Sequence, residues 1–273
     1  MNKIGALIVI KKDKDVFEQM KTLKSIGCEC CQLSMWDISM YTDDVAENIL
    51  AAAKEYGIEL STLWAGWSGP SRWNFTEGPS TLGIVPPAYR MQRTAELIQG
   101  AEFAKKLGIS RVATHAGFLP ENMTDPNYMD VLATLRHIVG KFGELGITFL
   151  FETGQETPIT LLRFIEEIGL DNVGINMDTA NLILYGKGNS ADAITVFGKY
   201  VLDTHIKDGF YPTSGKKLGA QAKVGDGVAN IPEVVKRLRE VGYQGNYIIE
   251  REISGEQQTK DIKETVDFLK SLI

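Results

Sequence analysis

Apolar and amphipathic segments alternate along the whole chain. Short runs rich in β-branched and aromatic residues predict buried strands, and longer segments with apolar residues three or four positions apart predict helices. The expected strands cover 4–10, 28–33, 58–64, 112–115, 147–152, 173–178, 201–207 and 247–250. The expected helices cover 15–25, 43–56, 88–107, 127–144, 158–168, 192–198, 232–241 and 260–272. Because strands and helices alternate, we expect parallel strands joined by right-handed helical crossovers.

The number of strand–helix pairs and the length of the chain favour a closed barrel. The chain has 273 residues, and one (β/α)₈ barrel commonly takes about 250. An open, doubly wound sheet is the alternative, but no glycine-rich dinucleotide-binding turn follows the first strand. Several expected helices run into a glycine that can close them: Gly27, Gly57, Gly108, Gly146 and Gly242. We predict an α/β protein made of a single TIM-barrel domain, residues 1–273, with its active site at the C-terminal ends of the strands.

Two expected loops are longer than the others. One covers 65–87 after the third strand, and the other covers 208–229 after the seventh. Both follow strands, so both lie on the face of the barrel where TIM-barrel enzymes hold their active sites. Long loops in compact domains are commonly lids or binding loops. We therefore expect these two loops to border the site.

Composition and charge limit the classes of partner. The chain has 29 Lys and Arg against 35 Asp and Glu, a net charge of -6, whereas nucleic-acid binders usually carry a basic surface. No stretch approaches the roughly 20 apolar residues of a membrane span, and the start of the chain lacks the pattern of a signal peptide. We expect no nucleic-acid or membrane partner and a cytoplasmic location. The three cysteines, Cys28, Cys30 and Cys31, lie in one segment and are expected to be reduced and buried.

Polar residues end four successive expected strands. They are Glu152, Asp178, His205 and Glu250. In a closed barrel these side chains converge, and three carboxylates repel one another unless a cation neutralises them. An oxygen-rich set with one imidazole suits Mn²⁺, Mg²⁺, Co²⁺ or Zn²⁺, and we favour Mn²⁺. The alternative is an ion-pair network without metal, in which Lys207 or Arg251 supplies the positive charge.

The same strand ends carry four recognisable motifs. They are FETGQE at 151–156, NMDTAN at 176–181, HIKD at 205–208 and IERE at 249–252, with a Gly-Asp-Gly turn at 225–227. Together they resemble the xylose isomerase-like TIM-barrel superfamily, specifically its sugar phosphate isomerase/epimerase branch. The resemblance extends over essentially the whole chain. It implies one divalent metal held by Glu152, Asp178, His205 and Glu250, and a small-molecule sugar substrate.

The resemblance implies an isomerase or epimerase that acts through a metal-stabilised enediolate. A metal that chelates a sugar carbonyl and the adjacent hydroxyl promotes loss of the proton between them. A glutamate on each side of the sugar can then remove and return that proton, and Glu152 and Glu250 are the candidates. The alternative for either glutamate is a role as metal ligand only.

The sequence also departs from one branch of that superfamily. Its ketose 3-epimerases usually have a second histidine soon after the strand-six aspartate, where this chain has Asn181, and an arginine after the strand-seven histidine, where it has Tyr211. Two other functions therefore stay open: a metal-dependent lyase similar to inosose dehydratase, and a non-catalytic sugar-binding barrel. The nuclease branch needs many more histidines than the three present.

Five residues are candidate substrate contacts: His115, Glu156, Lys207, Trp67 and Asn181. Lys207 follows His205 by two positions, so both side chains point to the same side of the strand. An aromatic face such as that of Trp67 packs well on sugar C–H surfaces. The alternatives are a buried core histidine for His115 and a helix cap for Glu156. A homo-oligomer is compatible with the sequence, and neither the sugar nor its phosphorylation follows from it.

Overall fold

A closed barrel forms the centre of the molecule in the computed structural model, which describes residues 2–273. Eight parallel strands within this range pair in the order β1-β10-β7-β6-β5-β4-β3-β2. They are β1 (Ile4–Val9), β2 (Cys30–Met35), β3 (Glu59–Ala65), β4 (Arg111–Thr114), β5 (Thr148–Glu152), β6 (Val173–Asp178), β7 (Val201–Ile206) and β10 (Tyr247–Ile249). Strand β1 closes the ring because it pairs with both β2 and β10. The predicted (β/α)₈ barrel is confirmed.

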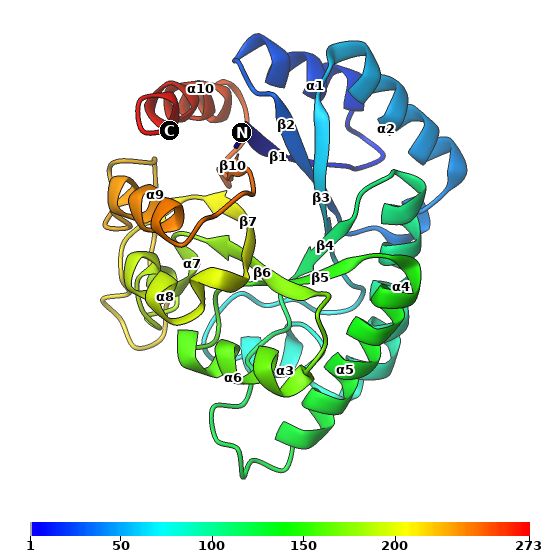
Figure 1. Cartoon of the computed structure of the whole chain (residues 1–273), viewed down its shortest axis with the longest axis vertical. Helices are drawn as coiled ribbons and strands as arrows, with labels where there is room; N and C mark the ends of the chain where they lie inside the picture. The colour runs from blue at the N-terminus through cyan, green and yellow to red at the C-terminus, as the bar shows by residue number, and fades with distance from the viewer. Residues whose placement is uncertain (1) are drawn as a thin grey trace.

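Helices surround the barrel as an outer layer (Figure 1). They are α1 (Val16–Ser25), α2 (Asp43–Tyr56), α4 (Pro87–Lys106), α5 (Tyr128–Leu145), α6 (Pro158–Ile168), α8 (Ser190–Phe197), α9 (Ile231–Glu240) and α10 (Glu256–Lys270). Local chemistry sets their ends: the Thr42 side chain accepts from Val45 N–H at the start of α2, and Gly57 ends it in the left-handed conformation. Helix α10 begins four residues before the predicted start, directly after Gly255.

Several short elements were not predicted. The helices α3 (Gly78–Thr81) and α7 (Asn181–Leu184) and the 3₁₀ turns η1 (Ile38–Met40) and η2 (Gly198–Tyr200) are each about one turn long. A two-stranded antiparallel ribbon, β8 (Asp208–Gly209) with β9 (Gln221–Ala222), lies within the second long loop. One turn of helix or two residues of strand give no periodic pattern, so the sequence could not reveal them.

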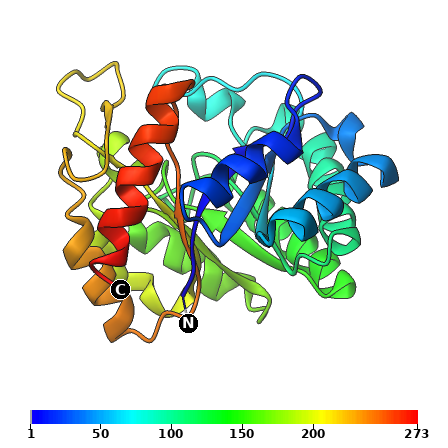
Figure 2. The same ribbon diagram turned by 90° about the horizontal axis from the view of Figure 1, so that it is seen from above.

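The two long loops lie on the same side of the barrel, opposite the two chain termini (Figure 2). The Asp208 carboxylate organises the second loop, because it accepts hydrogen bonds from the N–H groups of Gly209, Gly225, Gly227 and Ala229 at 2.8 to 3.1 Å. A Cβ atom on Gly227 would lie 2.2 Å from an oxygen of Asp208. The Gly-Asp-Gly turn therefore wraps around a buried carboxylate at the rim of the barrel.

Apolar side chains fill the space between strands and helices, whereas part of the barrel lumen is polar. Thr62 donates to Asp203 at 2.6 Å, and Gln32 donates to Asn176 at 2.9 Å, with all four side chains fully buried. Buried polar groups are stable when they are hydrogen-bonded. The three cysteines are buried and unpaired, as predicted. None of the helices in residues 2–273 has the length and hydropathy to cross a membrane.

Candidate metal centre

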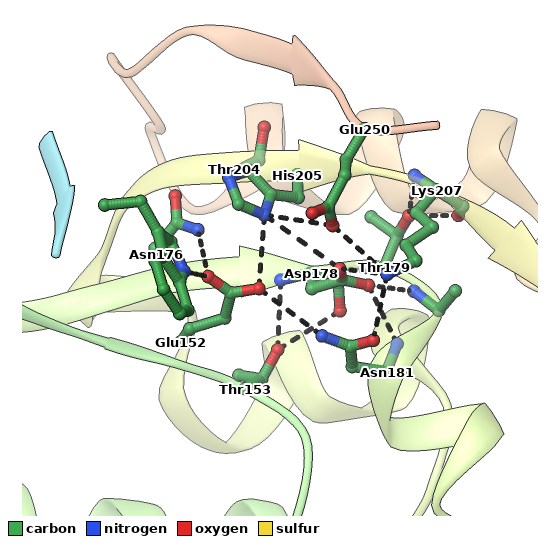
Figure 3. A network of polar contacts seen from close by, with 12 residues as sticks. Glu152, Thr153, Asn176, Asp178, Thr179, Asn181, Thr204, His205, Lys207 and Glu250 are labelled. Carbon is green, nitrogen blue, oxygen red and sulfur yellow. Dashed lines mark hydrogen bonds and ion pairs between the residues drawn. The ribbon is translucent and has the colours of Figure 1, made fainter. Parts of the chain in front are cut away.

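Four side chains meet where β5, β6, β7 and β10 end. They are Glu152, Asp178, His205 and Glu250, and one potential ligand atom of each lies within 4.8 Å of the others. His205 Nδ1 is 3.2 Å from Glu152 Oε1, 3.4 Å from Glu250 Oε2 and 4.0 Å from Asp178 Oδ2 (Figure 3). Three of the four are buried, and the side chain of Glu250 is 14% exposed. The structure thus brings the predicted ligands together, and their binding of a metal stays a prediction.

Threonine hydroxyls hold the strand ends that carry these ligands. Thr153 Oγ1, after β5, accepts from the N–H of Asp178 at 3.0 Å and donates to its carbonyl at 3.1 Å. Thr179 Oγ1, after β6, accepts from the N–H of Lys207 at 2.9 Å and donates to its carbonyl at 2.5 Å. Each threonine follows one strand, and its hydroxyl bonds the backbone of the next strand or of the residue that follows it. These hydrogen bonds hold neighbouring strand ends together and thereby fix the positions of the residues of the cluster.

Asp178 shows that the cluster fits a cation. Its Oδ1 accepts from the N–H groups of Ala180 and Asn181, both at 2.8 Å. Its Oδ2 is buried without a hydrogen-bond partner, which is uncommon for a buried oxygen. Burial, with the nearby charges of Glu250 and Glu152, raises the pKa of Asp178 to about 8, although Lys207 opposes the shift. A divalent cation would give Oδ2 a partner and stabilise the ionised carboxylate.

The pKa values of the other three residues of the cluster are set by burial and by neighbouring charges. Burial raises the pKa of Glu152, but His205 and His115 outweigh burial and bring it below its ordinary value. Burial also opposes ionisation of Glu250, where Lys207 and His205 hold the pKa well below its ordinary value. Burial lowers the pKa of His205, yet Glu152 and Glu250 raise it well above its usual range. The donor set of three carboxylates and one imidazole suits a hard or borderline divalent cation.

Lys207 is the buried cation beside the cluster, with 2% of its side chain exposed. Its Nζ lies 3.1 Å from Glu250 Oε2, 3.6 Å from Asp178 Oδ2 and 3.0 Å from Glu252 Oε1. Burial lowers the pKa of Lys207, and these three carboxylates raise it well above its ordinary value. Arg251 does not face the cluster, because its guanidinium donates to Asp261 and Gln221. Of the two cations suggested by the sequence, only Lys207 contributes.

A cavity of about 400 Å³ opens beside the cluster. Its walls are formed by Leu7, Val9, Ser34, Trp36, Trp64, Trp73, His115, Glu152, Asn181, Leu184, Tyr185, Lys207, Leu218, Glu250 and Glu252. Three tryptophans thus line it together with charged and amide groups. Such a combination of aromatic faces and convergent polar groups suits a small, hydroxyl-rich ligand.

Three of the five candidate substrate contacts line this cavity: His115, Asn181 and Lys207. His115 Nε2 is 3.4 Å from Glu152 Oε1, and its Nδ1 is buried without a hydrogen-bond partner. Burial lowers the pKa of His115, although the charges of Glu152 and Glu250 oppose this shift. Asn181 Nδ2 donates to Glu152 Oε1 at 3.4 Å, and Asn181 Oδ1 accepts from Lys207 at 3.4 Å.

The structure does not bring the other two candidates to the cavity wall. Trp67 is buried and packs against Trp36 and Trp64, with ring centroids 5.2 and 6.1 Å apart. Glu156 is buried, and its carboxylate accepts a hydrogen bond from Gly154 N–H at 3.3 Å. The capping alternative for Glu156 is wrong, since the side chain of Thr157 caps helix α6. Both residues lie in segments after strands, where sequence order does not fix the direction of a side chain.

Several residues that contact the cluster are not among the predicted site residues. Trp64 donates from Nε1 to Glu152 Oε2, and Asn176 Nδ2 donates to the same oxygen at 3.4 Å. Gln32 Oε1 lies 2.8 Å from His205 Nε2. The available signal was a glutamine or asparagine inside an otherwise apolar strand, because such a residue needs a buried partner.

Comparisons with known proteins agree with this architecture. The sequence profile of the family described as "Xylose isomerase-like TIM barrel" matches residues 20–272. The crystal structure of a xylose isomerase domain protein from Planctomyces limnophilus has a TM-score of 0.92 and 29% identity, covering 99% of this chain and 97% of that one. The structure of 3-keto-D-glucoside 4-epimerase from E. coli has a TM-score of 0.75 and 18% identity, covering 99% and 100%.

The matches to known protein sequences cover a smaller share of this chain than the matches to solved structures do. Inosose dehydratase from Lacticaseibacillus casei is 24% identical over 150 residues, which is 48% of this chain and 49% of that protein. The chain spans about half the length of the curated relatives it matches.

Proposed function

The chain belongs to the xylose isomerase-like TIM barrel family, and we propose that it is a divalent-metal-dependent isomerase or epimerase of a small sugar or sugar derivative. The observation that carries the proposal is the cluster of Glu152, Asp178, His205 and Glu250 at one end of the barrel. The E. coli relative, by its name, epimerises a keto-glucoside, which supports the reaction class. Mn²⁺ is our favoured metal, with Mg²⁺, Co²⁺ and Zn²⁺ as alternatives.

The two glutamates are our proposed catalytic residues. A divalent cation bound here would polarise a sugar carbonyl and its neighbouring hydroxyl, so that the hydrogen on the adjacent carbon becomes more acidic. Glu152 and Glu250 both line the cavity, and both have a lowered pKa that keeps them ionised. One ionised carboxylate can take the proton from one face of the carbon, and the other, after it has taken up a proton from water, can return that proton to the opposite face.

The remaining wall residues would orient the sugar. His115 and Lys207 offer polar atoms to substrate oxygens. The side chain of Asn181 is hydrogen-bonded to both Lys207 and Glu152. Trp36, Trp64 and Trp73 line the same cavity, where aromatic faces can pack on the C–H surface of the sugar and exclude water. Glu152, hydrogen-bonded to Trp64, would be held in one orientation toward the sugar.

Metal analysis tests this proposal. Protein purified without chelator should contain about one equivalent of divalent metal per chain, and Asp178→Asn and His205→Ala should lose it because each removes a proposed ligand. Glu252→Gln is the matched control, since Glu252 lines the cavity but lies outside the four-ligand cluster. The wild-type enzyme should then catalyse the exchange of a C–H hydrogen of the sugar for deuterium from deuterated water. A wild type without metal, and variants as stable as the parent, would contradict the proposal.

The similarity to inosose dehydratase supports a second candidate, a metal-dependent lyase. Removal of the same proton followed by loss of an adjacent hydroxyl releases water instead of returning the proton. Mass analysis of the product separates the two, because an isomerase or epimerase conserves the mass of the sugar and a lyase does not. Binding of a sugar without any turnover would instead favour the non-catalytic barrel.

A further inference from the structure

Gln32 lies inside the barrel and reaches His205 from a strand that is not adjacent. It belongs to β2 and is fully buried, whereas His205 belongs to β7. Gln32 Oε1 lies 2.8 Å from His205 Nε2, and Gln32 Nε2 donates to Asn176 Oδ1 at 2.9 Å. His205 Nδ1, the other ring nitrogen, faces the carboxylates of Glu152 and Glu250. The two nitrogens of one imidazole therefore have different partners.

The directions of these hydrogen bonds follow from the role proposed for Glu152 as a metal ligand, in which its carboxylate carries no proton. A carboxylate only accepts hydrogen bonds, so the contact of Asn176 with Glu152 Oε2 at 3.4 Å must use the amide NH₂ group of Asn176. The amide oxygen of Asn176 then faces Gln32, which must donate its own NH₂ group to it. This leaves the amide oxygen of Gln32 facing His205 Nε2. Because that oxygen only accepts, Nε2 must carry a proton.

We propose that Gln32 and Asn176 are positioning residues that fix the Nε2–H tautomer of His205 and keep Nδ1 as the metal-binding nitrogen. This inference rests on the metal centre proposed above. Partners of this kind fix the tautomer and ring orientation of histidines that bind metals, and their loss typically weakens metal binding about 10- to 100-fold. Asn176 also contacts Glu152, so the same amide pair orients two of the four proposed ligands.

A metal titration of Gln32→Leu tests the role of the amide oxygen. Free Mn²⁺ is measured by electron paramagnetic resonance, and we expect the Kd of the variant to rise about 10- to 100-fold over wild type. Thr62→Val is the matched control, because Thr62 is equally buried in the lumen and also bonds a residue of β7, Asp203, without contacting the cluster. The control should keep the wild-type Kd. Equal Kd values for Gln32→Leu and wild type would overturn the inference and leave the metal centre intact.

The tautomer itself is measurable in the wild type, which keeps the inference testable even if Gln32→Leu does not fold. The chain has three histidines, so long-range ¹H–¹⁵N spectra of the Zn²⁺-loaded protein can be assigned with a His137→Gln variant and a His115→Gln variant. We expect the proton of His205 on Nε2. A proton on Nδ1 would overturn the inference, and failure of the wild type to bind either Mn²⁺ or Zn²⁺ would overturn the proposed metal centre together with it.

Discussion

Glu156 is a buried carboxyl group outside the cluster of Glu152, Asp178, His205 and Glu250, and its burial links the stability of the protein to pH. The residue is 3% exposed. Burial raises its pKa to about 7, and hydrogen bonds from the backbone and the charge of Lys187 only partly oppose this shift. In the unfolded chain the group has its ordinary value of 4.5. The unfolded chain therefore loses this proton at lower pH than the folded chain does.

We expect this difference to destabilise the protein as the pH rises from about 4.5 through about 7. Below 4.5 the group is neutral in both states and has no effect, whereas above 7 the folded state must hold a buried charge. With about 1.4 kcal/mol per pKa unit, the Glu156→Gln variant should gain roughly 3 kcal/mol over wild type at pH 8 and little at pH 4.5. Urea unfolding of metal-free protein across this range measures the gain. Glu102→Gln, at an exposed position, is the control, and a gain independent of pH would contradict the prediction.

Arg93 shows how one residue of a helix can fix a long loop. Its guanidinium donates to the carbonyls of Ser68, Pro70, Thr81 and Gly83, which belong to the loop between β3 and α4. It also lies over the ring of Trp67, 5.3 Å from its centroid. Trp67, predicted as a substrate contact, thus packs between this cation and the tryptophans that line the cavity. Five donors in a rigid fork make arginine suited to this task.

Arg93→Met should loosen this loop without unfolding the barrel strands. Four carbonyl groups would lose a charged donor, each such bond being worth about 1.5–3 kcal/mol. We expect faster protease cleavage and faster hydrogen exchange within 66–83, together with weaker binding of any sugar that contacts Trp73. Arg136→Met is the control, because Arg136 is exposed and bonds the carbonyl of Glu167, which lies outside this loop. Unchanged exchange in the loop would show that other contacts hold it.

Strand and helix patterns were sufficient to predict the barrel and the convergence of the four polar residues at its strand ends. A residue such as Asp178 ends an apolar strand, and strand ends of a closed barrel meet at one rim. Gln32 and Asn176 were missed because their contact crosses the lumen between strands that are far apart in sequence. Glu156 was predicted as a substrate contact, but its side chain folds back onto Gly154. Side-chain directions in loops depend on tertiary contacts that periodicity does not record.

At the scale of the molecule, the proposed ligands come from four strands that are consecutive in the barrel. The order β10-β7-β6-β5 places Glu250, His205, Asp178 and Glu152 side by side around one half of the ring. Trp64 from β3 and Gln32 from β2 contact the same cluster from other strands. A cation bound here would therefore join segments separated by about 100 residues of sequence, from 152 to 250, and it would bind the folded chain far more tightly than the unfolded one.

Removal of this metal should lower the melting temperature of the whole protein. A ligand at 100 times its Kd stabilises the folded state by about 2.7 kcal/mol, and for a chain of this size roughly 2–4 °C accompanies each kcal/mol. We expect a decrease of about 5–10 °C when a chelator replaces excess Mn²⁺ in a calorimetric scan. Glu252→Gln should keep this difference, while Asp178→Asn should lose it, since Oδ2 of Asp178, which has no hydrogen-bond partner, is a proposed ligand of the cation. An equal decrease in Asp178→Asn would place the stabilising cation outside the four-residue cluster.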